Sequence, residues 1–221
     1  MYLLEAPKDH GVPDERTKFA VFAEACRILE EQGIPYIMGG GVAIRAYGRT
    51  RPLKDADIFL EKKWVFPAMD ALTRLGGFHT REMDAAWLYK ALKHDILVDI
   101  IVKTTGNVAI TQDTYDHCRD AELYGYTYRM MGPEDLMIRK ILSHKEGRPD
   151  MFDYLSMFED PVKDFDWQYF MSMVLPTTYR KVLGALLWVQ AETEVHVVPD
   201  WVICQLTERV LNDVCIQAQA S

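Results

Sequence analysis

Three consecutive glycines, Gly39 to Gly41, follow the apolar segment "IPYIM" directly. Glycine allows a chain to turn tightly, so we expect a short buried strand that ends in a sharp turn. The next segment, "VAIRAYG", is typical of a brief helix that ends at Gly48. A helix that starts directly after such a turn presents free N–H groups, which can bind an anion. The alternative is a plain turn with no ligand.

A pair of aspartates follows in "DADIFLEK", where polar and apolar residues alternate with the period of a strand. Residues two apart in a strand share a face, so Asp55 and Asp57 should point together while Ala56 and Ile58 face the packed side. Carboxylates that share a surface repel each other unless a cation lies between them. Mg²⁺ or Mn²⁺, bound by oxygen ligands, would remove that conflict. The alternative is a solvated strand edge.

A third aspartate, Asp99, interrupts the apolar, β-branched run "ILVDIIV". A charge in such a strand is costly unless it is paired, hydrogen-bonded or bound to a metal. If this strand lies beside the first one, Asp99 becomes a third metal ligand. Three carboxylates can hold two ions about 4 Å apart, one to activate a hydroxyl and one to neutralise a leaving phosphate. We therefore expect a two-metal site.

Four cations stand between the glycines and the aspartate pair, although the chain has a net charge of -8. They are Arg45, Arg49, Arg51 and Lys54. This local positive charge would suit a polyphosphate held near the same glycine turn. The alternative places these side chains on the exposed face of a short helix and in a loop.

Helical periodicity over residues 14–32 and 64–75 predicts helices that flank a sheet. The segments "FHTREM", "AWLYKAL" and "ILVDIIV" predict a meander of strands, and "ELYGYTYRMMG" one further strand, which could lie at an edge. From Pro133 onward every segment has a helical pattern. We predict an α+β fold in which a mixed sheet flanked by helices, residues 1–132, precedes a C-terminal helical bundle, residues 133–221.

Composition excludes several classes of protein. The chain has 221 residues, of which 49% are hydrophobic, and no apolar run reaches the ~18 residues of a membrane span. The start "MYLLEAPKDHGVPDER" lacks the features of a secretory signal, so we expect a cytoplasmic protein without a membrane partner. The acidic net charge argues against extended nucleic-acid binding, although tRNA stays open as a partner.

Taken together, the strand, "GGGVAIRAYG", the basic loop, "DADIFL" and "LVDIIV" resemble the nucleotidyltransferase superfamily of DNA polymerase β type. The order is similar above all to small prokaryotic members, such as abortive-infection toxins and antibiotic-modifying enzymes. Gly40 and Gly41 match the family's glycine pair, Asp55 and Asp57 its double carboxylate, and Asp99 its third carboxylate. The resemblance implies a nucleotidyltransferase-type sheet.

The resemblance continues in "PEDLMIRKILSHKEGRPDMFDYL", where Lys140 matches a family lysine and implies a contact with a nucleotide phosphate. Arg148, Asp150 and Asp153 match a later run of the family pattern. The chain departs from the pattern at Leu53, where many relatives have a threonine whose hydroxyl would be near the nucleotide or the metal.

The resemblance implies a metal-dependent enzyme that transfers a nucleoside monophosphate from an NTP to a hydroxyl acceptor and releases pyrophosphate. The implied catalytic and metal-binding residues are Asp55, Asp57 and Asp99. The implied nucleotide-binding residues are Gly40, Gly41, Arg51 and Lys140. The implied cofactor is Mg²⁺ or Mn²⁺.

The acceptor and the rival functions stay open. Aromatic residues near Trp167, Tyr169 and Trp188 would suit a small acceptor, such as an aminoglycoside-like antibiotic, or would simply belong to the core. The alternatives are a toxin that acts on tRNA and a protein of the same fold that binds nucleotide without transfer. A metal phosphohydrolase is disfavoured, because neither His79 nor His94 stands in a metal-spaced motif.

Overall fold

The computed structural model describes residues 13–145, 150–159, 164–194 and 196–220. At its centre is a mixed sheet with the strand order β3-β4-β5-β2-β1-β9-β8. In that order the strands span His79–Asp84, Leu88–Lys93, Ile96–Ile101, Asp55–Phe59, Ile37–Met38, Tyr126–Met130 and Arg119–Leu123. Two neighbouring pairs are parallel, β2 with β5 and β1 with β9, and the other pairs are antiparallel.

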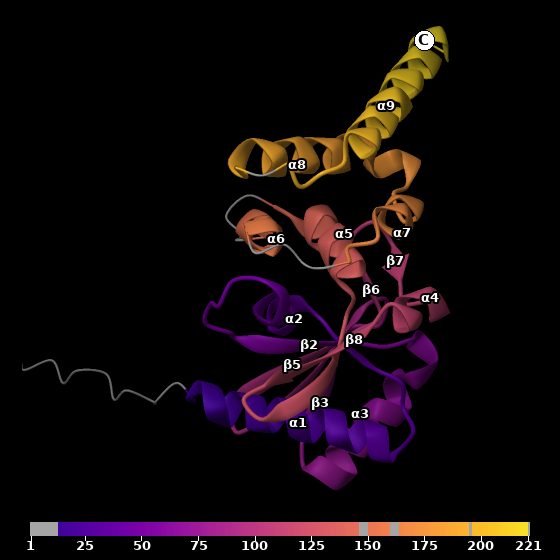
Figure 1. Cartoon of the computed structure of the whole chain (residues 1–221). Helices are drawn as coiled ribbons and strands as arrows, with labels where there is room; N and C mark the ends of the chain where they lie inside the picture. Colours follow the sequence, from indigo (N-terminus) through magenta and orange to yellow (C-terminus); the bar gives the residue numbers. More distant parts are fainter. Residues whose placement is uncertain (1–12, 146–149, 160–163, 195, 221) are drawn as a thin grey trace, which may run out of the picture.

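Helices cover both faces of this sheet (Figure 1). Helices α1 (Glu15–Glu31) and α3 (Val65–Gly76) pack together on one face, whereas α2 (Gly40–Tyr47) lies on the other. Helix α1 starts where the sequence predicted, because Asp14 accepts a 2.9 Å hydrogen bond from the Thr17 backbone N–H. Its residues Phe19, Phe22 and Leu29 are fully buried against the sheet. A short 3-10 helix, η1 (Lys62–Trp64), precedes α3.

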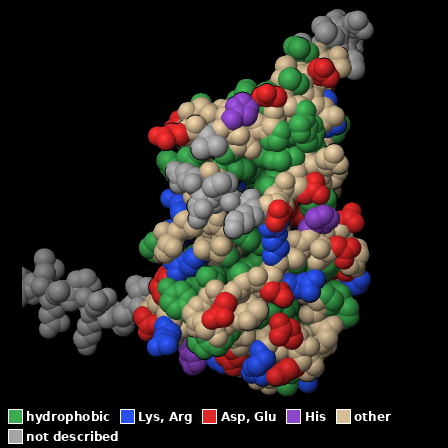
Figure 2. Space-filling model, in the orientation of Figure 1, with side chains coloured by type: hydrophobic (Ala, Val, Ile, Leu, Met, Phe, Trp, Pro, Cys, Tyr) green, Lys and Arg blue, Asp and Glu red, His purple; other side chains and the backbone are tan. Residues whose placement is uncertain are grey.

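The C-terminal part is helical, as predicted. It contains α5 (Pro133–Ser143), α6 (Asp150–Glu159), α7 (Trp167–Ser172), the 3-10 helix η2 (Pro176–Thr178), α8 (Tyr179–Glu192) and α9 (Asp200–Ala220). Helix α5 packs against α2, α6, α7 and α8, while α9 packs on α8 and projects from the body (Figure 1). Figure 2 shows hydrophobic side chains gathered over these helices on the visible face. A domain boundary near Gly132 stays a prediction.

One strand prediction was incomplete. The segment "ELYGYTYRMMG" belongs to a hairpin, in which β8 and β9 are joined by a turn at Tyr124 and Gly125, both with positive φ. Strand β9 lies inside the sheet beside β1, and β8 forms the edge. The residues of β8, "RDAEL", are all half-buried or exposed. The sequence of this edge strand therefore has no run of apolar residues by which to recognise it.

A second hairpin was not predicted at all. Strands β6 (Lys103–Thr104) and β7 (Val108–Ala109) pair across a turn in which Gly106 and Asn107 have positive φ. A short helix, α4 (Gln112–Asp116), follows it. In the parts of the chain that the structure describes, no helix has both the length and the apolar character needed to cross a membrane.

Candidate active site

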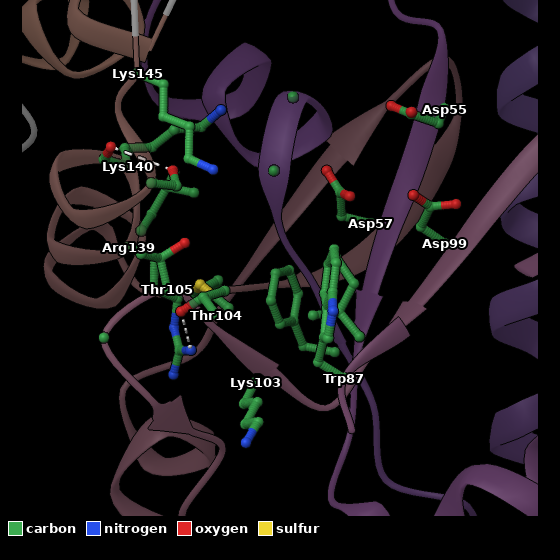
Figure 3. A pocket seen from close by; sticks show the side chains of 18 of the residues that line it. Asp55, Asp57, Trp87, Asp99, Lys103, Thr104, Thr105, Arg139, Lys140 and Lys145 are labelled. Carbon is green, nitrogen blue, oxygen red and sulfur yellow. Dashed lines mark hydrogen bonds between the residues drawn. The ribbon is translucent and has the colours of Figure 1, made fainter. Parts of the chain in front are cut away.

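A cavity of about 660 Å³ opens between the sheet, the β6–β7 hairpin and α5 (Figure 3). The residues that the resemblance implied as catalytic, metal-binding or nucleotide-binding all line it, namely Gly40, Gly41, Arg51, Asp55, Asp57, Asp99 and Lys140. These residues come from α2, the loop after it, β2, β5 and α5. The cavity lies within the size range of small-molecule sites in proteins.

The three carboxylates form one wall of the cavity. Asp57 on β2 lies directly opposite Asp99 on the parallel strand β5, and Asp55 stands two residues earlier on β2. Figure 3 shows the three side chains on neighbouring strands. Ala56 and Ile58 are fully buried on the opposite face, as the alternation predicted. The packed face thus fixes the register that brings the carboxylates together.

Electrostatics distinguish Asp57 from its neighbours. Burial raises the pKa of Asp57 to about 6, and the negative charges of Asp55 and Asp99 act in the same direction. Lys140 and the Gly41 backbone N–H lower the same pKa, but they do not offset the increase. Near neutral pH this carboxyl is therefore poised either to take a proton or to bind a cation.

The donor set fits Mg²⁺ or Mn²⁺, because both ions prefer carboxylate oxygens and three such groups converge here. Among the residues described, no three Asp, Glu, His or Cys side chains already form a closed set of ligands. Binding an ion would therefore require some of these carboxylate side chains to turn toward a shared point.

The glycine turn brings α2 against the carboxylate wall. Gly40 has φ +53°, and a Cβ atom there would lie 1.6 Å from Oδ2 of Asp57. A Cβ atom at Gly41 would lie 2.8 Å from Cδ2 of Leu53 and 3.1 Å from Nη2 of Arg51. The Gly39 backbone N–H also donates a 2.8 Å hydrogen bond to the Asp57 carbonyl. Side chains would not fit at positions 40 and 41 without displacing site residues.

Arg51 and Lys140 reach the cavity from a buried ion-pair network. Arg51 donates to both carboxylate oxygens of Asp153 at 3.0 and 3.1 Å, and Lys140 donates to Asp153 at 3.0 Å and to Asp150 at 3.2 Å. Burial alone would raise the pKa of Asp153, but the hydrogen bonds and charges of Arg51 and Lys140 hold that pKa below its usual value. The network fixes both cations beside the carboxylate wall.

The prediction that four cations gather at the site was wrong for three of them, because only Arg51 of the four lines the cavity. Arg45 forms an ion pair with Glu15, and Arg49 forms one with Asp153. Neither of these arginines lines the cavity, and nor does the exposed Lys54. Both arginines pair with carboxylates that are distant in the sequence, Glu15 and Asp153. The spacing of residues along the chain could not show these pairs. Arg148, part of the later family run, lies outside the described residues.

For the aromatic residues near Trp167, the structure supports the core alternative over an acceptor site. Trp167, Tyr169 and Trp188 do not line the cavity. Trp167 and Trp188 pack against the core, and the Tyr169 hydroxyl donates a 2.7 Å hydrogen bond to Asp135. Trp87, which sequence reasoning missed, lines the cavity instead and is 41% exposed.

Sequence reasoning also missed three cations of the cavity lining. Arg139 is 3% exposed and donates 2.8 Å hydrogen bonds to the carbonyls of Val108 and Ala109, which ties the β6–β7 hairpin to α5. Lys103 comes from that hairpin, and Lys145 stands exposed at the rim. Lys103 and Lys145 make no ion pair with any residue described. The sequence held one clue to these three cations, namely that Arg139 is adjacent to the predicted site residue Lys140.

Leu53 replaces the family threonine with a core residue. Its side chain is 2% exposed and packs over Gly41, and its carbonyl accepts a 2.7 Å hydrogen bond from Lys18. The position therefore supports the glycine turn through packing and offers no side-chain hydroxyl to a ligand.

Comparison with known proteins gives one family. Residues 18–210 match the family described as "Nucleotidyl transferase of unknown function (DUF2204)". No curated protein matches the sequence.

Solved structures offer weaker likenesses. The chain is similar to the antibiotic-resistance factor ANT(2'')-Ia at 17% identity and a TM-score of 0.48, over 93% of this chain and 100% of that one. It is similar to an antigenic nucleotidyltransferase-like protein from Paracoccidioides brasiliensis at 18% identity and a TM-score of 0.48, over 82% of this chain and 95% of that one. It is also similar to the lincosamide antibiotic adenylyltransferase LnuA at 14% identity and a TM-score of 0.46, over 62% of this chain and 94% of that one. At these values, the likenesses carry no inference about the substrate.

Proposed function

This chain belongs to the nucleotidyl transferase family DUF2204, and we propose that it transfers a nucleoside monophosphate from an NTP to a hydroxyl acceptor and releases pyrophosphate. One observation carries the proposal. Asp55, Asp57 and Asp99 stand together on one wall of a cavity that Arg51 and Lys140 also line. Anionic ligands for a divalent ion therefore lie beside cationic groups suited to phosphate.

The reaction would be an in-line phosphoryl transfer, in which positioning and charge neutralisation supply most of the rate increase. Mg²⁺ or Mn²⁺, when bound, would supply neutralisation of the phosphate charge and activation of the acceptor hydroxyl. Asp55 and Asp57 would hold the ions on the β2 side. Asp99 would complete their binding from β5 and accept the proton of the hydroxyl.

The cations and the glycine turn would bind the triphosphate. The backbone N–H groups at the start of α2 and the side chains of Arg51 and Lys140 would contact its oxygens. Arg51 and Lys140 are already fixed by Asp153, so little side-chain freedom would be lost on binding. In-line displacement would then put the acceptor on the side away from these cations, where Trp87 and Lys103 also line the cavity.

The charge of the lining bears on the acceptor. Among the described lining residues, the acidic ones are Asp55, Asp57 and Asp99, all within the metal-binding group. A polycationic aminoglycoside would find no other carboxylate to pair with, whereas a neutral or anionic hydroxyl compound would be compatible with Lys103 and Trp87. We therefore favour a small neutral or anionic acceptor over an aminoglycoside. A tRNA acceptor stays the second candidate, consistent with the same cations.

A nucleotide-binding protein without transfer activity is the rival of a different class. The buried Leu53, which removes a hydroxyl from the cavity, is the observation that favours it. Incubation with each α-labelled NTP, Mg²⁺ and a panel of lincomycin, tobramycin and tRNA separates the two. Label transfer that is lost in Asp99→Asn supports the enzyme. NTP binding with no label transfer or pyrophosphate release, unchanged in Asp99→Asn, supports the binding protein.

A further inference from the structure

Lys90 contacts the third carboxylate from outside the cavity lining. It stands on β4 directly opposite Asp99 on β5, and its Nζ donates a 2.8 Å hydrogen bond to Asp99 Oδ1. The Lys90 side chain is 28% exposed and that of Asp99 is 13% exposed, so water only partly screens the ion pair. Such a charge-assisted bond is stronger than one between neutral groups.

Strand alternation holds Lys90 in this position. Its neighbours Tyr89 and Ala91 are 1% and 0% exposed on the opposite face of β4, against the core. A slip of one residue would bury Lys90 and expose both neighbours, so the register is strongly specified. The core on one face of β4 therefore sets the Lys90–Asp99 contact on the other.

The charges form a row across four strands. Asp57 pairs in register with Asp99, Asp99 with Lys90, and Lys90 with Arg81 on β3. Residues opposite each other in register project from the same face of a sheet. The positive charge of the exposed Arg81 lies on the outer side of Lys90, so electrostatics favour the pairing of Lys90 with Asp99 over a position toward the sheet edge.

The three carboxylates are consequently not equivalent. Among the residues described, Asp99 has an ion-pair partner, whereas Asp55 and Asp57 have none. The bond to Oδ1 limits rotation of the Asp99 carboxyl group and leaves Oδ2 available. Groups that hold a metal ligand from behind commonly decide its orientation and the affinity of the site.

We propose that Lys90 is a positioning residue, which holds Asp99 Oδ1 so that Oδ2 meets a divalent ion shared with Asp57. The inference rests on the proposed function, because it requires that the carboxylates bind an ion. Lys90 touches neither substrate nor ion and acts through Asp99 alone.

The test is Mn²⁺ binding to the full-length protein, measured by electron paramagnetic resonance after EDTA treatment and dialysis. Lys90→Met should weaken Mn²⁺ binding about tenfold, and Lys90→Arg should restore most of the affinity. Lys93→Met is the matched control, because Lys93 lies on the same strand and pairs with Glu24 on the other face at 2.6 Å. The control should bind Mn²⁺ like the wild type.

A double-mutant cycle shows whether Lys90 acts through Asp99. In an Asp99→Asn background, Lys90→Met should change Mn²⁺ affinity less than twofold. If Lys90→Met does not fold by circular dichroism, Lys90→Gln replaces it, with a smaller expected loss of about threefold. In steady state, Lys90→Met should lower kcat while the KM for NTP stays within about twofold.

The outcomes separate the inference from the proposed function. Unchanged or tighter Mn²⁺ binding by folded Lys90→Met, with a wild type that binds Mn²⁺, overturns the inference and leaves the proposed function standing. A wild type that binds no Mn²⁺ contradicts the proposed function, and the inference fails with it.

Discussion

Gly40 and the carboxylate of Asp57 occupy adjoining space, such that a Cβ atom at position 40 would lie 1.6 Å from Oδ2 of Asp57. The backbone of Gly40 also has φ +53°, which favours glycine. The close approach of α2 to the carboxylate wall thus depends on the absence of a side chain at one residue.

Gly40→Ala should therefore lower activity about 100-fold, since Asp57 must move to accommodate the methyl group. Gly77→Ala is the matched control, because Gly77 has φ +64° and nothing lies within 4 Å of an added Cβ. Both variants should lose about 1 kcal/mol of unfolding free energy to backbone strain. Pyrophosphate-release assays and urea unfolding check this. Equal activity in the two variants would refute the steric explanation.

The raised pKa of Asp57 predicts a pH-dependent stability in the absence of divalent ions. The folded-state pKa of Asp57, about 6, exceeds the ordinary value of 3.8. Its contribution to the unfolding free energy is therefore fully present below pH 3.8 and is lost as the pH rises through 6. Between about pH 5 and 7.5, the wild type should lose about 1 kcal/mol of unfolding free energy relative to Asp57→Asn. Urea unfolding in EDTA measures this difference. A difference that does not vary with pH would show that Asp57 titrates normally.

Asp153 should matter more for stability than an exposed aspartate. It is fully buried and pairs with Arg49, Arg51 and Lys140. Asp153→Asn would leave these cations without their shared partner and should cost about 3 kcal/mol of unfolding free energy. Asp70→Asn, which breaks the exposed Asp70–Arg74 pair, should leave the unfolding free energy nearly unchanged. If Asp153→Asn and Asp70→Asn lowered the unfolding free energy in urea by similar amounts, the ion pairs of Asp153 would not stabilise the fold as proposed.

Two lysines of the lining should separate phosphate binding from folding. Lys145 is exposed and has no ion pair among the residues described, so Lys145→Met should raise the KM for NTP about threefold without changing the melting temperature. Lys140→Met should raise the KM and lower the melting temperature, because Lys140 pairs with buried Asp150 and Asp153. Kinetics and calorimetry provide both readouts. An unchanged melting temperature in Lys140→Met would contradict this division.

The carboxylate wall could be predicted from sequence because its signals are local. Alternation within one strand places Asp55 and Asp57 on one face, and the cost of burial makes Asp99 stand out in an apolar run. The adjacency of β2 and β5 was assumed, and the structure confirms it.

The remaining site residues depend on contacts between distant parts of the chain. Arg51 and Asp153 are 102 residues apart, so nothing near Arg51 in sequence showed that it is anchored. Lys90 stood in a correctly predicted strand, but its role depends on which residue of β5 it faces. The β6–β7 hairpin has two-residue strands, which are too short to produce a recognisable periodicity.

Pyrophosphate release from NTP in the presence of Mg²⁺, compared between the wild type and Asp57→Asn, tests the central claim most directly. If the carboxylates of β2 and β5 bind the ions that promote transfer, the wild type should release pyrophosphate only when Mg²⁺ or Mn²⁺ is present. Folded Asp57→Asn should then be slower by about 100-fold or more. Release at the wild-type rate in Asp57→Asn, or in EDTA, would contradict the account.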